Sequence, residues 1–499
     1  MLWSSVVCSQ KAFRLNQRFL NNLYMQNHLD ILSNAVSHWM NDDGPVATAP
    51  NAPELEQILD LKLGEKGCSI DDLSNAIHDY LKYSPNATKP DFYKLLYSGL
   101  NKDALLGDWI TSLVNSTMHT YQVGPVATLM ELELIQQWNT LVGFDAGDGV
   151  MVSGGSQANL ISMMLARQKA CPNIKTKGHG ALNEQGALVA YVSDQSHYSY
   201  QRAANILGIG SDNLIAIKSD DQGRICPNSL AKAIEKDEVE GRTPFFIGLT
   251  AGTTVVGAYD PVKICSEIAL KYGLWLHIDG AWGAPVLFSS THKHLLSDCH
   301  LADSFAWDAH KLLNVPITAA VILVKESGAL RDCCAGGGGE YLFHNDANKE
   351  FNLGERSIQC GRRSDALKVW LSWKAVGHSG FQAKIDYLQA LKRRTVGMIE
   401  GEPCFELLAP TVYLNILFRY KPEQTLNEEQ IAQLNIQLCT KMREQGGPYV
   451  DYARYKGATG IRLILANDVA TDDDIQRLLK HCLKVGQELE MAIYIKPEE

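Results

Sequence analysis

A lysine just beyond an apolar run is the residue of this sequence best suited to covalent chemistry. Lys311 follows His310 and comes shortly after the run 303–307. If that run is a buried strand, the lysine at its end is desolvated, which lowers its pKa and frees the amine to attack carbonyls. Such an amine can form a Schiff base, and pyridoxal phosphate is the commonest biological partner in that bond. Alone the pattern is weak evidence, because most lysines beyond a strand are solvated.

A carboxylate closes a second apolar run, 274–279. Asp279 would be costly to bury unless it met a cation, and the protonated ring nitrogen of pyridoxal phosphate is such a cation. An ionised partner at that nitrogen keeps the ring an effective electron sink. Gly280 and Ala281 come next, and residues this small let a flat ring lie close to the backbone. The alternative is an aspartate that caps a helix or faces a loop.

Three further segments carry groups that suit the same cofactor. Gly155 and Ser156 open a helical pattern, where free backbone N–H groups and a hydroxyl can bind a phosphate, although the segment is neither a Walker A nor a GxGxxG motif. His197 follows another apolar run, and an imidazole can stack on a pyridine ring or relay protons. Thr254 lies in a turn after a further run and offers a hydroxyl. Each segment is more often structural when it stands alone.

The elements that must position these residues are apolar, β-rich runs that alternate with helical patterns. Near-continuous apolar strands alternating with helices predict an α/β fold whose mostly parallel, seven-stranded sheet is covered on both faces. Ligands of such sheets bind beyond the carboxyl ends of the strands, and each candidate residue above follows such an end. The predicted strands are 149–153, 187–193, 213–218, 244–250, 274–279, 303–307 and 319–324, and the clearest helical patterns are 159–169, 229–238, 261–272 and 363–376.

The chain on either side of this region has a different sequence pattern. Helical patterns with turn signals fill the first part of the chain, which is too small to bury a large core by itself and would pack on a neighbour. The C-terminal part combines strand-like segments at 412–418 and 460–465 with a closing helix at 472–489. We expect three parts: an N-terminal helical segment at 1–110, a large cofactor-binding domain at 111–378 and a small C-terminal α+β domain at 379–499.

Composition excludes several classes of function. The 499 residues carry a net charge of −10, which argues against a nucleic-acid partner. No apolar run approaches the length of a transmembrane helix, so no membrane partner is expected. The 12 cysteines form no CxxC pair, so neither a metal site nor a disulfide framework is indicated. A reducing, cytoplasmic location is therefore the default expectation.

The N-terminus leaves two interpretations open. Residues 1–29 contain Lys11, Arg14 and Arg18 but no acidic residue, a composition that transit peptides share. The apolar residues of the same stretch also fit an amphipathic helix that packs on a partner.

Taken together, the candidate segments resemble those of one enzyme family. SDQSHYS (193–199), GTT (252–254), HIDGAWG (277–283) and DAHK (308–311) occur in the order and spacing of the group II pyridoxal-phosphate-dependent amino-acid decarboxylases. TYQVGP (120–125), IQCGR (358–362) and KVWL (368–371) are similar to the branch that contains the glutamate, cysteine-sulfinate and aspartate decarboxylases. The resemblance extends from about Phe92 to Leu479.

The resemblance implies an architecture and a set of roles. The fold would be that of the type I pyridoxal-phosphate enzymes, typified by aspartate aminotransferase, in a homodimer with active sites at the subunit interface. The implied cofactor contacts are a Schiff base at Lys311, Asp279 on the ring nitrogen, His197 and Ala281 on the two ring faces, Gly155, Ser156 and His310 near the phosphate, and Thr254 near the 3′-oxygen or the substrate. For the substrate, Arg462 would bind the carboxylate, and Tyr341, just after the glycines 336–339 that would hinge a lid, would protonate Cα.

Three positions depart from the family's pattern and bear on the substrate. Leu95 stands where the glutamate and cysteine-sulfinate enzymes carry a glutamine that reads the side chain, and leucine cannot hydrogen-bond a distal carboxylate. His119 replaces the usual aromatic residue and could offer a cation to an acidic side chain. Asp308 replaces the usual asparagine near the phosphate and brings a possible negative charge there. An acidic substrate shorter than glutamate, such as aspartate or cysteine sulfinate, is the expectation.

Three alternatives stay open at this stage. The first keeps the cofactor but decarboxylates an aromatic, aliphatic or basic amino acid. The second is a different pyridoxal-phosphate reaction, such as transamination or oxidative deamination, which a tyrosine at position 341 disfavours. The third is a scaffold without catalysis, against which the intact Lys311, Asp279, His197 and Arg462 argue.

Overall fold

The computed structural model describes residues 25–48, 50–336, 339, 341–344, 346–423 and 425–495. The first 24 residues, which carry most of the acid-poor N-terminal stretch, lie outside the described residues, so neither interpretation of that stretch is tested. Gly337 and Gly338 of the expected hinge also lie outside them.

A seven-stranded sheet forms the centre of the large domain. Its strand order is β1-β7-β6-β5-β4-β2-β3. Only β7 among these seven runs against its neighbours, because it pairs antiparallel with both β1 and β6. The strands are β1 (Asp148–Val152), β2 (Leu188–Ser193), β3 (Leu214–Ile217), β4 (Thr243–Thr250), β5 (Trp275–Asp279), β6 (Ser304–Asp308) and β7 (Ala320–Val324). The predicted mostly parallel sheet of seven strands is confirmed, and each strand lies within a residue or two of its predicted range.

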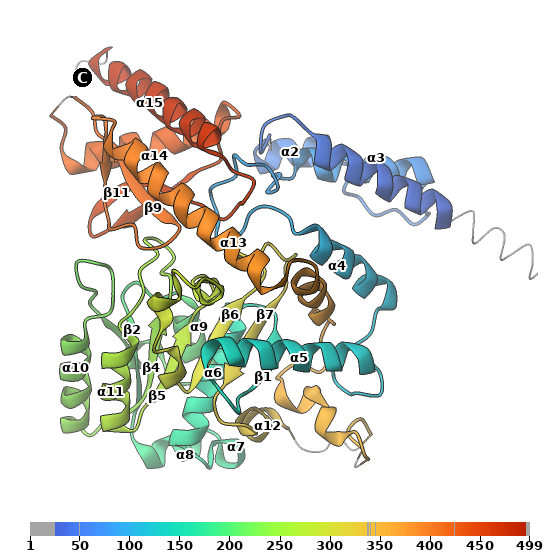
Figure 1. Ribbon diagram of the computed structural model, residues 1–499, viewed down its shortest axis with the longest axis vertical. Helices are drawn as coiled ribbons and strands as arrows, with labels where there is room; N and C mark the ends of the chain where they lie inside the picture. Colours follow the sequence, from blue (N-terminus) through green and yellow to red (C-terminus); the bar gives the residue numbers. More distant parts are fainter. Residues whose placement is uncertain are drawn as a thin grey trace, which may run out of the picture.

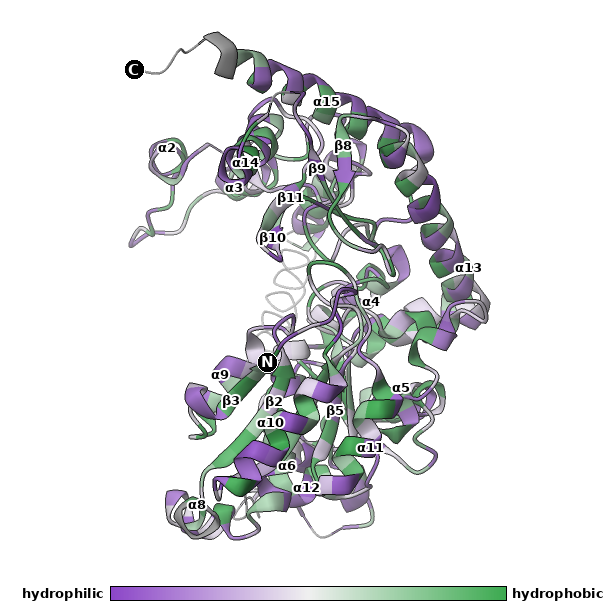
Figure 2. Ribbon diagram, turned by 90° about the vertical axis from the view of Figure 1, so that its left-hand side faces the viewer, coloured by the Kyte–Doolittle hydropathy of each residue, from purple (hydrophilic) through white to green (hydrophobic). Residues whose placement is uncertain are grey.

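Helices cover both faces of this sheet and explain its unbroken apolar strands. Successive side chains of a strand point to opposite faces: Ile247 and Leu249 of β4 belong to one apolar core, whereas Phe246 belongs to a second core on the other face. The first core includes helices α5 (Pro125–Val142), α10 (Pro227–Val239) and α11 (Val262–Tyr272), and the second includes α6 (Gly155–Ala170), α9 (Ser199–Ile206) and α12 (Ala329–Cys334). In Figure 2 the central strands are mostly green, while the surrounding helices also carry purple residues. Two short helices, α7 (Ile174–Lys177) and α8 (His179–Gln185), follow α6.

The N-terminal helices stand away from the body of the molecule (Figure 1). Residues 25–41 are helical, and α2 (Ala52–Ile58) and α3 (Ile70–Tyr83) follow, neither of which contains a buried residue. The chain between α3 and α4 (Lys102–Val114) is irregular, where Pro85 and Pro90 remove helical hydrogen bonds. The helical reading of the N-terminal segment therefore does not extend over residues 84–101.

A long helix joins the large domain to the C-terminal one. α13 (Ala366–Glu400) packs on α4 and α5 at one end and on β8 and α15 at the other, and Figure 1 shows it running between the two bodies. Gly377 interrupts it with a φ of 67° and non-helical geometry. We propose that the boundary between the large domain and the C-terminal domain lies at residue 378, next to this interruption.

The C-terminal domain is a four-stranded antiparallel sheet with order β10-β11-β9-β8. Two of its strands, β9 (Asn415–Tyr420) and β11 (Ala458–Ile464), correspond to predicted segments. β8 (Phe405–Leu407) and β10 (Asp451–Tyr455) are additional, and α14 (Glu428–Glu444) and α15 (Asp472–Ile495) complete the domain. Among the described helices, none is long and apolar enough to span a membrane. Cysteines in the described part of the chain are free thiols.

Candidate active site

A cavity of about 340 Å³ opens at the carboxyl ends of the central strands. Its lining follows the ends of β1, β2, β4, β5 and β6, five strands that point the same way. Eight of the residues selected from sequence line it: Gly155, Ser156, His197, Thr254, Asp279, Ala281, His310 and Lys311. The sheet thus brings together side chains that are up to 156 positions apart in the chain, from 155 to 311.

Lys311 lies in the turn directly after β6 and forms an ion pair inside the cavity. Its Nζ is 3.2 Å from Oδ2 of Asp308, the last residue of β6. Nε2 of His310 lies 3.6 Å from the same oxygen. Burial lowers the pKa of His310, although Asp308 opposes the shift. His310 is therefore mainly neutral at pH 7, and Lys311 is the cation that faces Asp308.

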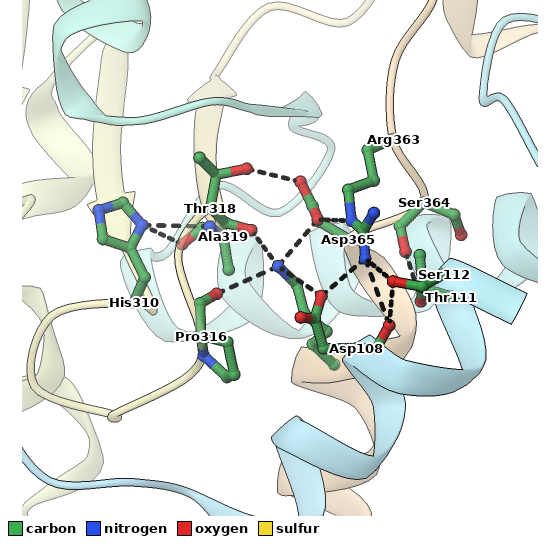
Figure 3. A network of polar contacts seen from close by, with 11 residues as sticks. Asp108, Thr111, Ser112, His310, Pro316, Thr318, Ala319, Arg363, Ser364 and Asp365 are labelled. Atoms are coloured by element: carbon green, nitrogen blue, oxygen red, sulfur yellow. Dashed lines mark hydrogen bonds and ion pairs between the residues drawn. The ribbon is translucent and has the colours of Figure 1, made fainter. Parts of the chain in front are cut away.

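A polar network behind the cavity holds the His310 ring (Figure 3). Nδ1 of His310 lies 3.0 Å from the backbone oxygen and 3.1 Å from the backbone nitrogen of Ala319. The segment before Ala319 is fixed by Lys368, whose Nζ donates to the oxygens of Pro316 (3.1 Å) and Thr318 (2.6 Å). The same Nζ pairs with Asp365 at 2.9 Å, and Thr318 Oγ1 donates to Asp365 at 2.9 Å. Lys368 thus braces the loop that returns from Lys311 to β7.

Asp279 is buried at the end of β5 and is held through both carboxylate oxygens. Asn159 Nδ2 donates to Oδ2 at 2.7 Å, and the Ala281 backbone N–H donates to Oδ1 at 3.1 Å. Asn159 lies on α6 one turn after Ser156, and its Nδ2 also contacts Ser199 Oγ at 2.9 Å. Hydrogen bonds to the charged form of a carboxylate favour that form.

Asn159 is itself oriented by a buried chain of hydrogen bonds. His277 Nε2 lies 3.0 Å from Asn159 Oδ1, and His277 Nδ1 lies 2.8 Å from Ser304 Oγ. Trp275 Nε1, which can only donate, lies 2.8 Å from the same Ser304 oxygen. Burial lowers the pKa of His277 to about 4, so the imidazole is neutral at pH 7. The donors then run in one direction, from Trp275 through Ser304, His277 and Asn159 to Asp279.

The start of α6 forms a close-packed cradle beside Asp308. A Cβ on Gly155 would lie 3.0 Å from the Ala281 Cβ and 3.2 Å from Asp308 Oδ2, so a larger residue would crowd both neighbours. Ser153 donates through its backbone and its hydroxyl to Gln157 Oε1, at 2.8 and 2.7 Å, which fixes the turn into the helix. The first N–H groups of α6 have no intrahelical acceptors, and they border the cavity.

The C-terminal domain supports the other side of the cavity through Asn415. Its Nδ2 donates to the backbone oxygen of Thr254 at 3.0 Å, and its Oδ1 accepts from Trp282 Nε1 at 2.8 Å. His197 lies against Tyr198, with ring centroids 4.3 Å apart. Burial lowers the pKa of His197, with Asp279 opposing, so this imidazole too is mainly neutral at pH 7.

Four of the predicted residues do not line this cavity. Arg462, on β11, lies beside the segment 92–96, and its Nη2 is 3.3 Å from the backbone oxygen of Lys94. Leu96 lines the cavity, whereas its neighbour Leu95 does not. His119 lies on the loop before α5, where Nδ1 contacts Thr117 Oγ1 at 3.0 Å. The side chain of Tyr341 is 78% exposed.

Comparisons with known proteins decide the family. The model described as "Pyridoxal-dependent decarboxylase conserved domain" matches residues 53–421. The chain belongs to this family. It is 35% identical over 469 residues to the cysteine sulfinic acid decarboxylase of Rattus norvegicus, covering 92% of this chain and 94% of that protein. It is 34% identical to the acidic amino acid decarboxylase GADL1 of Bos taurus, with 87% and 85% covered.

A solved structure agrees with this assignment. The crystal structure of mouse CSAD in apo form superposes with a TM-score of 0.88 at 34% identity, covering 93% of this chain and 98% of that one. The protein is a pyridoxal-phosphate-dependent amino-acid decarboxylase of the type I fold, and the expectations for fold, enzyme class and cofactor are confirmed.

The residues around the cavity fit the family's cofactor. Asp279 offers a carboxylate, fixed by Asn159, that could accept a hydrogen bond from a ring N–H. Lys311 offers an amine for the Schiff base, and the start of α6 offers free N–H groups for a phosphate. Two buried oxygens at the cavity, Thr250 Oγ1 and Asp308 Oδ1, have no hydrogen-bond partner among the described residues. No group of three or more His, Cys, Asp or Glu positioned to hold a metal ion occurs within the described ranges.

Sequence reasoning missed the residues that support the site. Asn159 was noted only as the start of a helical pattern, and Asn415 and Ser304 were not selected at all. One signal for Asn159 was available, because a polar residue three positions after Ser156 lies on the same helical face. Asn415 carries no comparable local signal, since its partners are 133 and 161 positions away.

Proposed function

We propose that the enzyme removes the α-carboxylate of an acidic amino acid shorter than glutamate, such as aspartate or cysteine sulfinate. The observation that carries recognition of a substrate carboxylate is Arg462. Its Nε is buried without a hydrogen-bond partner among the described residues, and its neighbour Lys94 leads into Leu96 at the cavity. Burial lowers the pKa of Arg462, which marks a poorly solvated cation that gains from an anionic ligand. The acidic relatives named above support the side-chain class.

The reaction converts an amino acid and one proton into an amine and carbon dioxide. Bound pyridoxal phosphate supplies a ring that accepts the electron pair left by the departing carboxylate. Asp279, oriented by Asn159 and the Ala281 N–H, would accept a hydrogen bond from the ring nitrogen. Lys311 anchors the cofactor between turnovers, and Arg462 holds the carboxylate of the substrate. Tyr341 delivers the proton to Cα.

The second candidate is decarboxylation of a non-acidic amino acid. Leu96 favours it, because this apolar side chain lines the cavity. Its neighbour Leu95 stands where related enzymes carry a glutamine that contacts the side chain of the substrate. An aromatic or aliphatic side chain would pack on leucine without needing a charged partner.

We further propose a homodimer that acts in the cytoplasm. The exposure of Tyr341 supports the dimer, since a proton donor outside the cavity of its own chain is available to the cavity of a partner subunit. Large apolar side chains are also exposed on the N-terminal helices, among them Leu73, Ile77 and Tyr80 of α3. Free cysteines support a reducing compartment.

Release of carbon dioxide from the twenty amino acids, cysteine sulfinate and cysteate tests the substrate class. Cysteine sulfinate or aspartate should be the best substrates, whereas a preference for an aromatic or aliphatic amino acid would overturn the acidic assignment. The purified enzyme should absorb in the visible range, and Lys311→Ala should abolish that band. Lys325→Ala is the matched control, because its Nζ binds the His300 oxygen at the opposite edge of the sheet. An unchanged spectrum in Lys311→Ala would refute the role of Lys311.

A further inference from the structure

We propose that Asp308 weakens the hold of this enzyme on its cofactor, because its carboxylate competes with the phosphate for the same cradle. The inference rests on the proposed role of the cavity in binding pyridoxal phosphate. It predicts that the Asp308→Asn variant retains the cofactor better than the natural enzyme does.

Asp308 is a buried carboxylate with an unused acceptor. Its side chain is only 2% exposed, and it lines the cavity. Oδ2 contacts Lys311 and His310, but Oδ1 has no hydrogen-bond partner among the described residues. A buried polar atom without a partner is costly. Asp308 is therefore a buried carboxylate that is only half satisfied within the site.

The carboxylate lies against the first residue of α6. A Cβ on Gly155 would be 3.2 Å from Oδ2 and 3.4 Å from Oδ1, so both oxygens rest on this residue. The start of a helix favours a negative charge and binds phosphate through its free N–H groups. Asp308 thus lies beside the place that an incoming phosphate would occupy.

The cavity has too few positive charges to neutralise a phosphate in addition to the Asp308 carboxylate. Asp308 forms its ion pair with Lys311, at 3.2 Å, and burial lowers the pKa values of both His310 and His197, which disfavours a positive charge on either ring. Asp279 adds another carboxylate to the lining of the cavity. Lys368, the next cation behind His310, is already paired with Asp365. Because Lys311 is committed to the carbonyl of the cofactor, a phosphate at the start of α6 would face the Asp308 carboxylate, and like charges in a partly buried site repel strongly.

The test compares ligand binding by the cofactor-free enzyme and its variants. Asp308→Asn keeps the shape of the side chain and removes the charge. The matched control is Asp303→Asn, at the other end of β6, where the carboxylate accepts from the Leu276 N–H at 2.7 Å. Titration with pyridoxal phosphate, followed by visible absorbance, should show affinity at least about fivefold higher for Asp308→Asn and unchanged for the control.

Two further probes separate the phosphate from the rest of the cofactor. Inorganic phosphate should raise the melting temperature of Asp308→Asn at lower concentrations than it does for the natural protein. Pyridoxal, which lacks the phosphate, should bind both proteins equally. Asp308→Ser removes the charge with a smaller side chain and should shift phosphate binding in the same direction, which covers a folding defect in the asparagine variant.

Equal or weaker binding of pyridoxal phosphate by Asp308→Asn would overturn the proposal. An equal gain for pyridoxal would overturn it as well, because the effect would then act through Lys311 rather than the phosphate. Failure of the proposed function looks different: the natural protein would show no visible band at any concentration of pyridoxal phosphate. The inorganic phosphate measurement would still report on Asp308 in that case.

Discussion

Asn159 Nδ2 lies 2.7 Å from Oδ2 of Asp279, although the two residues are 120 positions apart in the chain. The amide can point its nitrogen at Asp279 because its oxygen is occupied by His277 Nε2 at 3.0 Å. Trp275 and Ser304 determine in turn which ring nitrogen of His277 carries the proton. The orientation of the carboxylate is therefore fixed by four residues that are remote from any substrate, which makes Asn159 a positioning residue.

Asn159→Ala should weaken cofactor binding and lower stability together. The variant leaves Asp279 without its side-chain donor and His277 without its acceptor, and each unsatisfied buried group costs about 1–3 kcal/mol. We expect affinity for pyridoxal phosphate to fall about tenfold, which corresponds to about 1.4 kcal/mol. Absorbance titration measures the affinity, and urea denaturation measures the stability.

The control for Asn159→Ala is a second buried asparagine that is far from the cavity. Asn139 on α5 donates to the Asp148 oxygen at 3.4 Å. Asn139→Ala should lose stability but keep its cofactor affinity. If both variants lose affinity to the same extent, the effect of Asn159 is general destabilisation and its positioning role is wrong.

The stability of the protein should depend on pH through His277. Burial lowers the pKa of His277 from 6.5 to about 4, with Asp279 opposing. Between these pH values the unfolded chain binds the additional proton, so the contribution of His277 is complete above pH 6.5 and is lost as the pH falls towards 4. The stability advantage of the natural protein over His277→Gln should shrink by about 1.4 kcal/mol per pH unit in this window.

Urea unfolding at several pH values measures this difference. Burial raises the pKa of Asp260 to about 7, so this carboxyl titrates in an overlapping range. Its effect is common to both proteins and cancels in the comparison. A stability difference that stays constant with pH would show that His277 is not kept neutral by burial.

The sequence was sufficient to predict the large sheet and the edge at which the site lies. Strands buried on both faces are continuous apolar runs, and polar residues directly after them stand out, as Asp279 and Lys311 do. The edge strands of the smaller sheet escaped prediction for a physical reason. β8 has three residues, and β10 alternates between partly buried and exposed positions, so neither forms an apolar run.

Long-range contacts within the site could not be predicted from local patterns. The pairing of Asn159 with Asp279 and of Asn415 with Trp282 depends on where separate segments of the chain meet in space. Local patterns also cannot predict which residues would act in the cavity of a second subunit. Tyr341 and His119 lie outside the cavity of their own chain, and their roles stay predictions.

Lys368→Met should destabilise the protein more than an ordinary buried substitution does. The side chain of Lys368 is fully buried. Its loss leaves Asp365 with only the longer ion pair to Arg363, at 3.5 Å, and leaves the oxygens of Pro316 and Thr318 without a donor. Removing one partner of a buried ion pair typically costs about 3–5 kcal/mol. Thermal and urea denaturation should show a loss of this size.

Two comparisons show whether the ion pair causes the loss. Lys392→Met on the same helix removes a buried lysine that donates to the Thr411 oxygen at 2.8 Å, so its loss should be smaller. Adding Asp365→Asn to Lys368→Met should restore part of the stability, because the buried carboxylate that lost its nearest cation is then neutral. If the double variant is no more stable than Lys368→Met, the charge of Asp365 does not explain the loss.

Tyr341 should act on the cavity of the other subunit. Tyr341→Phe should keep the cofactor but direct turnover towards aldehyde or transamination products, because Cα is no longer protonated. Heterodimers of one Lys311→Ala subunit and one Tyr341→Phe subunit, isolated through two different tags, provide the test. In such a dimer one site has both natural residues and the other has neither, so amine formation should recover to about half of the natural rate.

A matched heterodimer keeps this test specific. Lys311 and Asp279 line the same cavity of one chain, so a heterodimer of Lys311→Ala and Asp279→Ala subunits has two damaged sites and should form almost no amine. Recovery in the first pair alone establishes that Tyr341 works across the interface. Equal inactivity of both pairs would mean that Tyr341 serves its own subunit, and its exposure would then require closure of the loop over the cavity of the same chain.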